Sequence, residues 1–444
     1  MLCDDFQKKT LVNVTIISMM TIIPLLFGSY YTVSAFSLTQ IGHRSNGSMT
    51  SLSMAGGKTK KKGGKKKASG KSSSSVTGLK GFGAASTSSA LPKNVELDKS
   101  KSTLDFYEYL ERNGAGGPQL KRVALAYFDG FLRGVVALKD IEKGDAILDI
   151  PYELAWNLGR ESSDPTLPAI TVLQDYVAAK KESGTKENQH KRGPYLEMLP
   201  KYMTEDCLGS TDFFSQDALD ALQSPLIVEE TEYRQQLCGL RFERDIQPLL
   251  PPNTDLFLWD TETAVTEQHL RWAVWLVTSR VLTVQGEIPS ERYRLMIPFI
   301  DMCNHDRNSP HVLTGRAAPG GRLKVSAGCN IKQGEQINIC YGGGVVGNDR
   351  FIQDYAFLDA VDKAYDLVAK ILTGRQRVLE GKNIDRPTLL PVADREKAME
   401  ALKQTTIEED QSLLASSTDM PNDVKSAIQY RLGVKLALQK LGDF

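Results

Sequence analysis

The feature of this 444-residue sequence that most constrains its fold is a hydrophobic run that passes directly into polar residues. Residues 297–300 read Ile-Pro-Phe-Ile, and residues 301–306 continue as Asp-Met-Cys-Asn-His-Asp. Burying a polar side chain costs free energy unless it is hydrogen-bonded. The run therefore predicts a buried segment whose Asn304 and His305 side chains lie at the edge of a core.

A second stretch of the same kind follows about 35 residues later, a spacing that fits one intervening hairpin. Residues 336–344 read Gln-Ile-Asn-Ile-Cys-Tyr-Gly-Gly-Gly, and residues 354–357 read Asp-Tyr-Ala-Phe. Together the stretches resemble the paired signature motifs of the SET domain, the fold of most protein lysine methyltransferases. The first resembles the Asn-His motif of that family. The second resembles its catalytic-tyrosine strand and the Asp-Tyr-Gly-Phe-like turn that follows.

Periodicity elsewhere in the chain suits this fold. Strands are expected over 123–127, 133–137, 146–150, 322–327 and 336–341, and helices over 99–113, 168–183, 217–222, 229–250, 266–282, after 359 and at the end of the chain. The long helical stretch before the Asn-His motif resembles the plastid Rubisco-methyltransferase branch of the family. The resemblance implies an α+β fold, in which a SET domain of small β-sheets with a threaded segment is split by a helical insertion. A short, mostly helical C-terminal domain follows.

The expected domain boundaries follow from the same reading. They are a signal peptide over 1–35, a transit-like disordered basic leader over 36–95, the N-terminal part of the SET domain over 96–165, the helical insertion over 166–285, the C-terminal part of the SET domain over 286–360, and a helical substrate-binding-like domain over 361–444.

The resemblance implies S-adenosylmethionine as the cofactor and assigns residues to it. In the family, the turn before an Arg-Gly strand lays its backbone against the cofactor, and here that turn is Phe131, Leu132 and Arg133. The family usually has glycine where Leu132 stands, so the backbone contact is expected rather than a side-chain contact. Asn304 and His305 would meet the adenosyl group, largely through backbone atoms, with a hydrogen-bonded core histidine as the alternative for His305.

The helix expected to begin after Thr266, a plausible N-cap, ends in Ser279-Arg280. This pair resembles the Ser/Thr-Arg that faces the active site in the family. Arg280 would contact cofactor or substrate, and an ion pair with a nearby acid is the alternative. Ser279 and Asp301 resemble residues that border the channel for the acceptor lysine.

Tyr341 is the expected catalytic residue and also borders the cofactor. Its hydroxyl would orient the acceptor amine and the methyl group, and a core tyrosine at a strand end is the alternative. Tyr355 resembles the tyrosine of the family turn that lines the lysine channel. The next residue is Ala356 where the family has glycine, which costs about 1 kcal/mol if the backbone there needs a positive φ.

Other chemistries fit the sequence less well. The glycine run 342–344 lacks the Gly-Lys-Ser/Thr of a phosphate-binding loop. The six cysteines show no Cys-x-x-Cys spacing, so neither zinc nor any other metal is expected. Cys340 has no marked His-Asp or His-Asn pair to make it a nucleophile, and a buried strand cysteine is the simpler interpretation.

The N-terminal region has the composition of a targeting leader. Lys8 and Lys9 precede an apolar run over 11–27 and the small residues at 33–35, which is typical of a secretory signal peptide, with a retained membrane anchor as the alternative. Residues 36–95 contain no Asp or Glu, and Phe36 follows the expected cut. This order resembles the bipartite plastid leader of algae. The lysine clusters 60–62 and 65–67 also admit a nuclear or nucleic-acid-binding interpretation, which the apolar signal disfavours.

The function implied is methyl transfer to lysine in a plastid protein, with the Rubisco large subunit or a plastid aldolase as acceptors known for the branch. The chain is expected to act as a monomer, without nucleic acid and without stable membrane association once the leader is removed. Two alternatives remain open. Related branches methylate histidine on a cytoskeletal protein, and a SET-like chain can be a non-catalytic protein-binding module.

Overall fold

The computed structural model describes residues 91–115, 121–130, 132–162, 164–182, 191–249, 264–380, 383–416 and 419–444. The expected signal peptide and nearly all of the basic leader lie outside these residues. Within the described ranges, no helix is long and apolar enough to cross a membrane.

The fold is of the expected α+β class and begins with a short strand and a helix. Strand β1 (Val95–Leu97) is followed by α2 (Lys101–Arg112), whose N-cap Ser100 accepts a hydrogen bond from the Thr103 amide. The helix ends before Gly114, which has φ +83°. Its buried face carries Phe106, Tyr107 and Leu110 at helical spacing, so the helix forms because one apolar stripe meets the core.

The central sheet joins segments that are far apart in the chain. Its strand order is β1, β2 (Val123–Phe128), β3 (Leu132–Ala137), β11 (Gln336–Ile339) and β8 (Asn304–His305). Strand β11 pairs antiparallel with β3 and parallel with β8, and the parallel register sets Ile339 opposite His305. This register brings the Asn-His segment beside the strand that leads to Tyr341.

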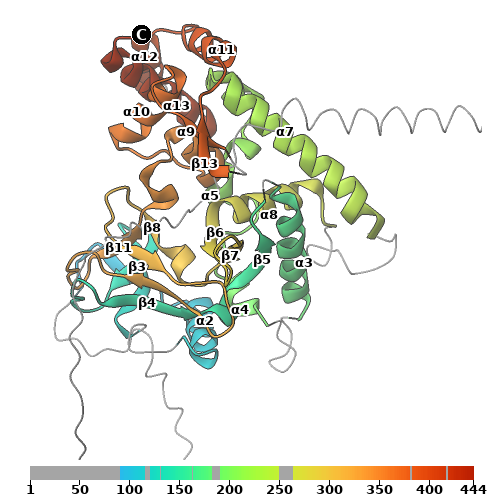
Figure 1. Ribbon diagram of the computed structural model, residues 1–444, viewed down its shortest axis with the longest axis vertical. Helices are drawn as coiled ribbons and strands as arrows, with labels where there is room; N and C mark the ends of the chain where they lie inside the picture. The colour runs from blue at the N-terminus through green and yellow to red at the C-terminus, as the bar shows by residue number, and fades with distance from the viewer. Residues whose placement is uncertain are drawn as a thin grey trace, which may run out of the picture.

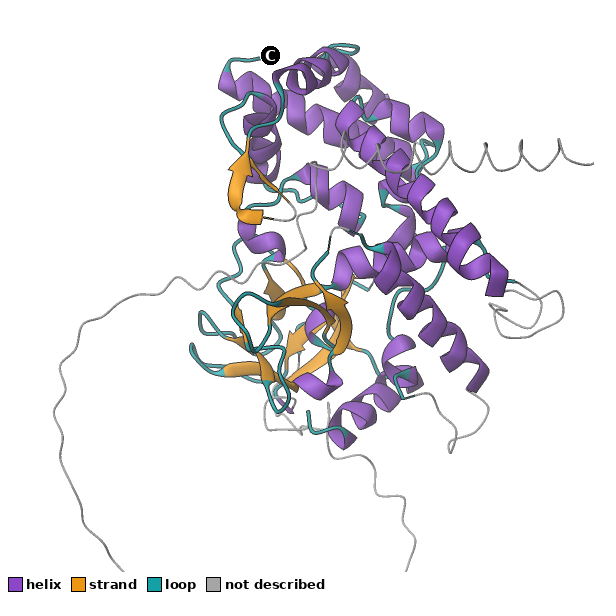
Figure 2. Ribbon diagram, turned by 45° about the vertical axis from the view of Figure 1, so that its right-hand side comes forward, coloured by secondary structure: helices purple, strands orange, loops and turns teal. Residues whose placement is uncertain are grey.

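Two further three-stranded sheets complete this half of the molecule. One has the order β4 (Ala146–Pro151), β10 (Arg322–Ser326), β9 (Val312–Thr314), and the other β5 (Trp156–Arg160), β7 (Arg292–Met296), β6 (Leu282–Gln285). Short 3₁₀ turns cover Tyr152–Leu154 (η2) and Ile300–Met302 (η8). Figure 2 shows most strands gathered in one half of the molecule, with helices beside and beyond them.

Helices fill the chain between β5 and β6. They are α3 (Thr166–Glu182), α4 (Gly193–Leu196), α5 (Glu205–Leu208), η4 (Thr211–Phe213), α6 (Gln216–Ala221), α7 (Pro225–Arg241) with its continuations η5 (Phe242–Ile246) and η6 (Gln247–Leu249), and α8 (Glu267–Arg280). Helix α8 begins with a capping box made by Thr266 and His269. Tyr176 of α3 meets Trp272 of α8 edge-on, with ring centroids 4.8 Å apart.

A mostly helical region follows the last sheet strand. Its elements are η9 (Tyr341–Gly344), α9 (Asn348–Arg350), η10 (Phe351–Tyr355), α10 (Asp362–Leu372), the hairpin β12 (Val378–Glu380) and β13 (Asn383–Thr388), α11 (Val392–Leu402), α12 (Ile407–Ser416) and α13 (Asn422–Leu441). Figure 1 shows α10 to α13 packed together at the end of the molecule opposite the sheets. A second hydrophobic core joins α10, α11 and α13 to α6 and the start of α7.

Candidate active site

Tyr341 lies immediately after β11, where the two motif segments meet. Its hydroxyl donates a hydrogen bond to the Cys303 carbonyl at 2.7 Å, and its backbone N–H donates to His305 Nδ1 at 3.0 Å. Its ring stacks on that of Tyr355, with centroids 5.1 Å apart and an interplanar angle of 29°. Both ends of Tyr341 are therefore fixed by the Asn-His segment.

The glycine run after Tyr341 allows the chain to turn away sharply. Gly342 and Gly343 both have φ +60°, in the left-handed region that L side chains rarely adopt. A β-carbon on Gly342 would lie 2.0 Å from the nearest side-chain atom of Val346. The run therefore serves the turn at the site, and a phosphate-binding role is not needed to explain it.

His305 is a buried histidine in its neutral form. Because a backbone N–H can only donate, the bond from Tyr341 requires an unprotonated Nδ1, and the ring proton then lies on Nε2. Nε2 is 3.5 Å from Asp359 Oδ2. Burial lowers the pKa of His305, and the nearby Asp359 carboxylate opposes that shift only in part. His305 thus positions the Tyr341 backbone and packs against Phe351, at 4.7 Å between ring centroids.

Asn304 connects the motif to the turn expected to face the cofactor. Its Nδ2 donates to the Arg133 carbonyl at 2.9 Å. Gly134 makes this possible, since a β-carbon there would lie 2.7 Å from Asn304 Nδ2. The Arg133 guanidinium faces elsewhere, 3.2 Å from both Asp98 Oδ2 and the Met198 carbonyl. Leu132 is exposed, and Phe131 falls outside the described residues.

Arg280 and Asp301 form a buried polar pair behind the motif. Arg280 Nη1 donates to the Asp301 carbonyl at 2.9 Å and lies 3.6 Å from its carboxylate. Tyr195 of α4 donates to Asp301 Oδ2 at 2.7 Å. Burial raises the pKa of Asp301, against the opposing effect of Arg280. Ser279 is hydrogen-bonded within its own helix, to the Trp275 carbonyl at 2.7 Å, and joins this group only through its neighbour Arg280.

Sequence reasoning missed Tyr195. It lies in a Pro- and Gly-broken region about a hundred residues before Asp301, and its contact with that residue depends on the folding of the insertion. The only local signal is its place in a short apolar run.

Tyr355 ends η10 on the other side of the Tyr341 ring. The following Ala356 has φ +65° and ψ +24°, so this backbone does adopt the left-handed conformation that the family usually gives to glycine. Burial raises the pKa of both Tyr341 and Tyr355. The two phenols are therefore neutral at physiological pH.

The structure thus brings most of the predicted residues to one place. Tyr341, His305 and Tyr355 are in direct contact, and Asn304 extends the cluster to the backbone of Arg133. Arg280 reaches it through the backbone of Asp301, two residues before Cys303. The Nε atom of Arg280 and the Oδ1 atom of Asp301 are buried and have no hydrogen-bond partner among the described residues.

The chain is similar in sequence to known methyltransferases. Residues 132–342 match the family model of the SET domain. The chain is 25% identical over 308 residues to the chloroplastic ribulose-1,5 bisphosphate carboxylase/oxygenase large subunit N-methyltransferase of Pisum sativum, covering 64% of this chain and 58% of the relative. It is 26% identical over 255 residues to actin-histidine N-methyltransferase of Homo sapiens, covering 54% of this chain and 39% of the relative. The chain therefore spans from about two-fifths to three-fifths of these relatives.

Solved structures share the backbone fold. The SET domain of LSMT bound to lysine and AdoHcy superposes with a TM-score of 0.52 at 19% identity, covering 78% of this chain and 91% of that one. Rubisco LSMT bound to AdoMet gives 0.51 at 19% identity, with the same coverage. Residues 132–342 therefore form a SET domain, and the shared backbone fold with these structures agrees with that match.

Proposed function

We propose that this protein transfers a methyl group from S-adenosylmethionine to the side-chain amine of a lysine in a plastid protein. The observation that carries the proposal is the junction at Tyr341. Its hydroxyl is fixed on the Cys303 carbonyl, its ring is stacked on Tyr355, and its backbone is held by His305. Positioning of this kind is most of what such a transfer requires from a protein.

The buried surroundings favour the reactive form of the acceptor. A lysine amine attacks only when it is neutral, because the protonated form has no lone pair. Burial raises the pKa of the Tyr341 phenol, and the same desolvation lowers the pKa of an amine that enters beside it. In the reaction a nitrogen–carbon bond forms as the carbon–sulfur bond breaks, and the resulting ammonium loses a proton to solvent.

Arg280 and the Asn-His segment suit an S-adenosylmethionine molecule. The unpartnered Arg280 Nε is a buried cationic donor, which fits a ligand that carries a carboxylate. The backbone at Leu132 and Arg133, together with Asn304 and His305, would hold the remainder. When bound, the cofactor supplies an activated methyl group. The protein orients the acceptor and excludes water from it.

Lysine is the acceptor we favour, and histidine is the second candidate. The relatives include both a Rubisco large-subunit methyltransferase and actin-histidine methyltransferases. The acid-free leader over 36–95 and the chloroplastic name of the pea relative support a plastid location, and therefore a plastid acceptor such as the Rubisco large subunit or an aldolase. A fluorescent fusion of the full chain that stays outside plastids would contradict that location.

The test is incubation of the protein with labelled S-adenosylmethionine and plastid extract, followed by mass spectrometry of the labelled residue. Label on lysine supports the proposal, and label on histidine would instead support histidine as the methyl acceptor. Calorimetry with the cofactor is the companion measurement. If the folded protein binds none, the chain is a non-catalytic SET-like module that acts by protein binding.

A further inference from the structure

Residues of the helical insertion contact the turn that carries Tyr355 and hold it in place. Gln353 and Asp354 precede Tyr355 in η10, and both are buried. The Gln353 carbonyl accepts hydrogen bonds from Ser210 Oγ at 2.7 Å and from Arg234 Nη2 at 3.2 Å. The last carbonyls of a helix have no partner within it, so these two residues of the insertion satisfy a group that η10 leaves open.

Arg234, in α7, also fixes the carboxylate next to Tyr355. Its Nη1 lies 2.8 Å from Asp354 Oδ1, and its Nε donates to Asp212 Oδ1 at 3.1 Å. Arg350 Nε donates to the other carboxylate oxygen of Asp354, Oδ2, at 2.9 Å. Each oxygen of the carboxylate therefore meets a different guanidinium group, one from the insertion and one from its own segment, and these charge-assisted contacts clamp the carboxylate and fix its direction.

Backbone contact reinforces the clamp. A β-carbon on Gly209 would lie 2.5 Å from the Ala356 carbonyl oxygen, so only glycine lets the insertion pack this closely. Gly209 directly precedes Ser210, and Ala356 directly follows Tyr355. The insertion therefore touches the turn on both sides of the tyrosine.

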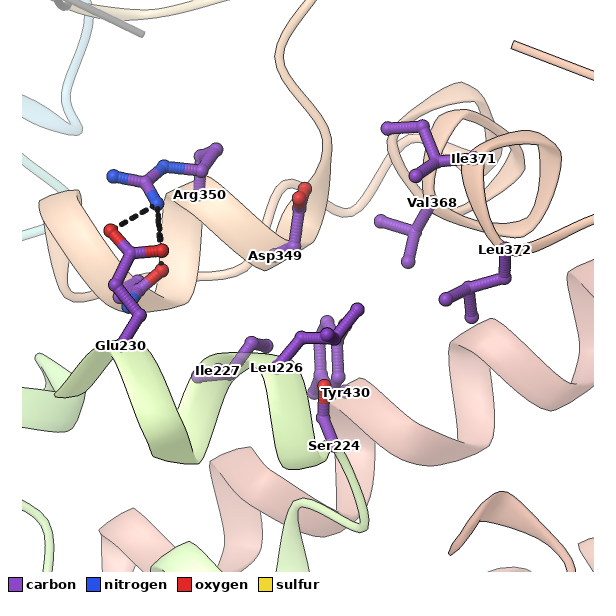
Figure 3. Close-up of a pocket in the computed structure, with 11 residues that line it drawn as sticks. Ser224, Leu226, Ile227, Glu230, Asp349, Arg350, Val368, Ile371, Leu372 and Tyr430 are labelled. Carbon is purple, nitrogen blue, oxygen red and sulfur yellow. Dashed lines mark hydrogen bonds and ion pairs between the residues drawn. The ribbon is translucent and has the colours of Figure 1, made fainter. Parts of the chain in front are cut away.

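Helix α7 is anchored at both ends. Ile227, near its start, belongs to the C-terminal core, and Cys238, near its end, belongs to the core of the SET portion. Beside the clamp, Arg350 Nη1 donates to both carboxylate oxygens of Glu230 in α7, each at 2.8 Å (Figure 3). The cavity drawn there has room for about one water molecule, too little for an acceptor side chain. The contacts of this region hold the turn.

We infer that Arg234 is a positioning residue, which with Ser210 sets the place of the Tyr355 ring against Tyr341. The inference rests on the proposed function, in which Tyr355 borders the acceptor channel. Arg234 and Ser210 reach this turn through their hydrogen bonds to Gln353 and Asp354. Their effect is transmitted by the two residues before Tyr355.

The test is Arg234→Met, assayed for kcat, KM, cofactor affinity and the number of methyl groups added, with rates expressed per folded molecule. A misplacement of about 1 Å can cost on the order of a hundredfold in rate. We expect kcat to fall by about ten- to a hundredfold and cofactor affinity to stay nearly unchanged, because Asn304 and Arg280 lie on other segments. Arg234→Lys keeps the charge without the fork and should give an intermediate kcat.

A matched control exists in α13. Arg431 is a buried arginine that donates to the Asp410 carboxylate at 2.9 Å and to the Ala221 carbonyl at 2.9 Å, far from Tyr355 in the fold. Arg431→Met should lower stability and leave kcat per folded molecule unchanged. If Arg234→Met behaves in the same way, Arg234 is only structural and the inference is wrong.

A readout independent of activity separates this inference from the proposed function. Fluorotyrosine labelling gives a ¹⁹F signal for Tyr355, which the Tyr355→Phe variant assigns. We expect Arg234→Met to shift that signal and Arg431→Met to leave it in place. A wild-type protein that transfers no methyl group would overturn the proposed function, whereas an unmoved Tyr355 signal would overturn the positioning role. If Arg234→Met does not fold, Ser210→Ala replaces it, with a smaller shift expected and the same contradicting result.

Discussion

His305 holds the backbone of Tyr341 through its Nδ1 atom, and this hydrogen bond exists only while the imidazole is neutral. Burial lowers the pKa of the ring from its ordinary value of 6.5. The folded protein therefore binds fewer protons here than the unfolded chain below that pH. The stabilisation that neutral His305 provides is complete above about pH 6.5 and is lost as the pH falls below that value.

This linkage can be tested with His305→Gln. The wild type should lose stability as the pH falls below about 6.5, where the unfolded chain's histidine gains its proton before the folded one. The variant is expected to be less stable at pH 7 and to lose less on acidification. His311→Asn is the comparison, because its pKa is also lowered by burial but it lies away from Tyr341. Equal acid sensitivity in wild type and His305→Gln would show that another group controls this window.

Ala356 is a strained residue beside Tyr355. Its left-handed backbone costs an L-residue about 1–2 kcal/mol. Ala356→Gly removes that strain but raises the entropy of the unfolded chain, which costs about 0.4–1 kcal/mol, so we expect a net gain of between about 0 and 1.6 kcal/mol in unfolding free energy. Ala178→Gly, in the middle of helix α3, should instead lose about 0.5–1 kcal/mol. A loss at both positions in urea unfolding would contradict the assigned conformation.

Much of the site could be foreseen at this scale. Tyr341, His305, Asn304 and Tyr355 were expected from two short motifs, and the structure places them together. The ion pair of Arg280 with an acid was the alternative considered for that arginine, and its partner is Asp301, but the second partner of Asp301 could not be foreseen. Tyr195 comes from a distant helix, and no local pattern links the two residues.

At the scale of elements, helix α2 supports the entrance to the Asn-His segment. Phe299 stands immediately before η8 and has φ +73°, which is rare for a bulky residue. Phe106 of α2 stacks on Phe299 with centroids 6.2 Å apart and an angle of 13°, and Tyr107 packs at the same distance. The surrounding aromatic side chains hold this strained residue in place.

Truncating the helix face tests this support. Phe106 is fully buried, so Phe106→Ala should lower the unfolding free energy by about 3–5 kcal/mol. Leu104, on the same helix, is 40% exposed, and Leu104→Ala should change stability by no more than about 0.5 kcal/mol. Similar losses for both variants in denaturant unfolding would show that α2 is not packed as described.

Periodicity predicted most helices and the hairpin strands to within a few residues. It missed the sheet formed by β5, β7 and β6: β5 carries a glycine, β7 alternates with arginine, and β6 is only four residues long, so none of them stands out from loops. Helix α7 begins at Pro225, four residues before its predicted start, because Ser224-Pro225 is itself a helix-start signal that the apolar pattern overshadowed. Helices α11 and α12 lie in the region expected to be mostly helical but were not predicted individually.

At the scale of the whole molecule, two hydrophobic cores meet along the insertion. A ligand that binds only the folded form raises its stability by about 2.7 kcal/mol at a hundred times its Kd. We therefore expect S-adenosylhomocysteine to raise the Tm in a concentration-dependent manner.

No group of three or more His, Cys, Asp or Glu side chains in the described ranges could hold a metal. A chelator should accordingly change neither this shift nor the activity, and a chelator-sensitive Tm shift would contradict the metal-free assignment.

The central claim is that the Tyr341 hydroxyl acts in methyl transfer. Tyr341→Phe removes one oxygen and keeps the ring on Tyr355, so the fold should survive. In the proposed function the hydroxyl would align the reacting groups mainly in the transition state, and such interactions appear in kcat rather than in binding. By analogy with the loss of an oxyanion-hole donor, about 2.7–4 kcal/mol, we expect a hundred- to thousandfold fall in rate.

The decisive measurement is the rate of methyl transfer by Tyr341→Phe relative to wild type, per folded molecule, with Tm and cofactor affinity recorded alongside. The account predicts a large fall in rate with nearly unchanged cofactor affinity. A core tyrosine would instead lose about 1 kcal/mol of stability with its hydrogen bond to Cys303 and keep its rate. A rate within about threefold of wild type, well under 1 kcal/mol, would contradict the catalytic role of Tyr341.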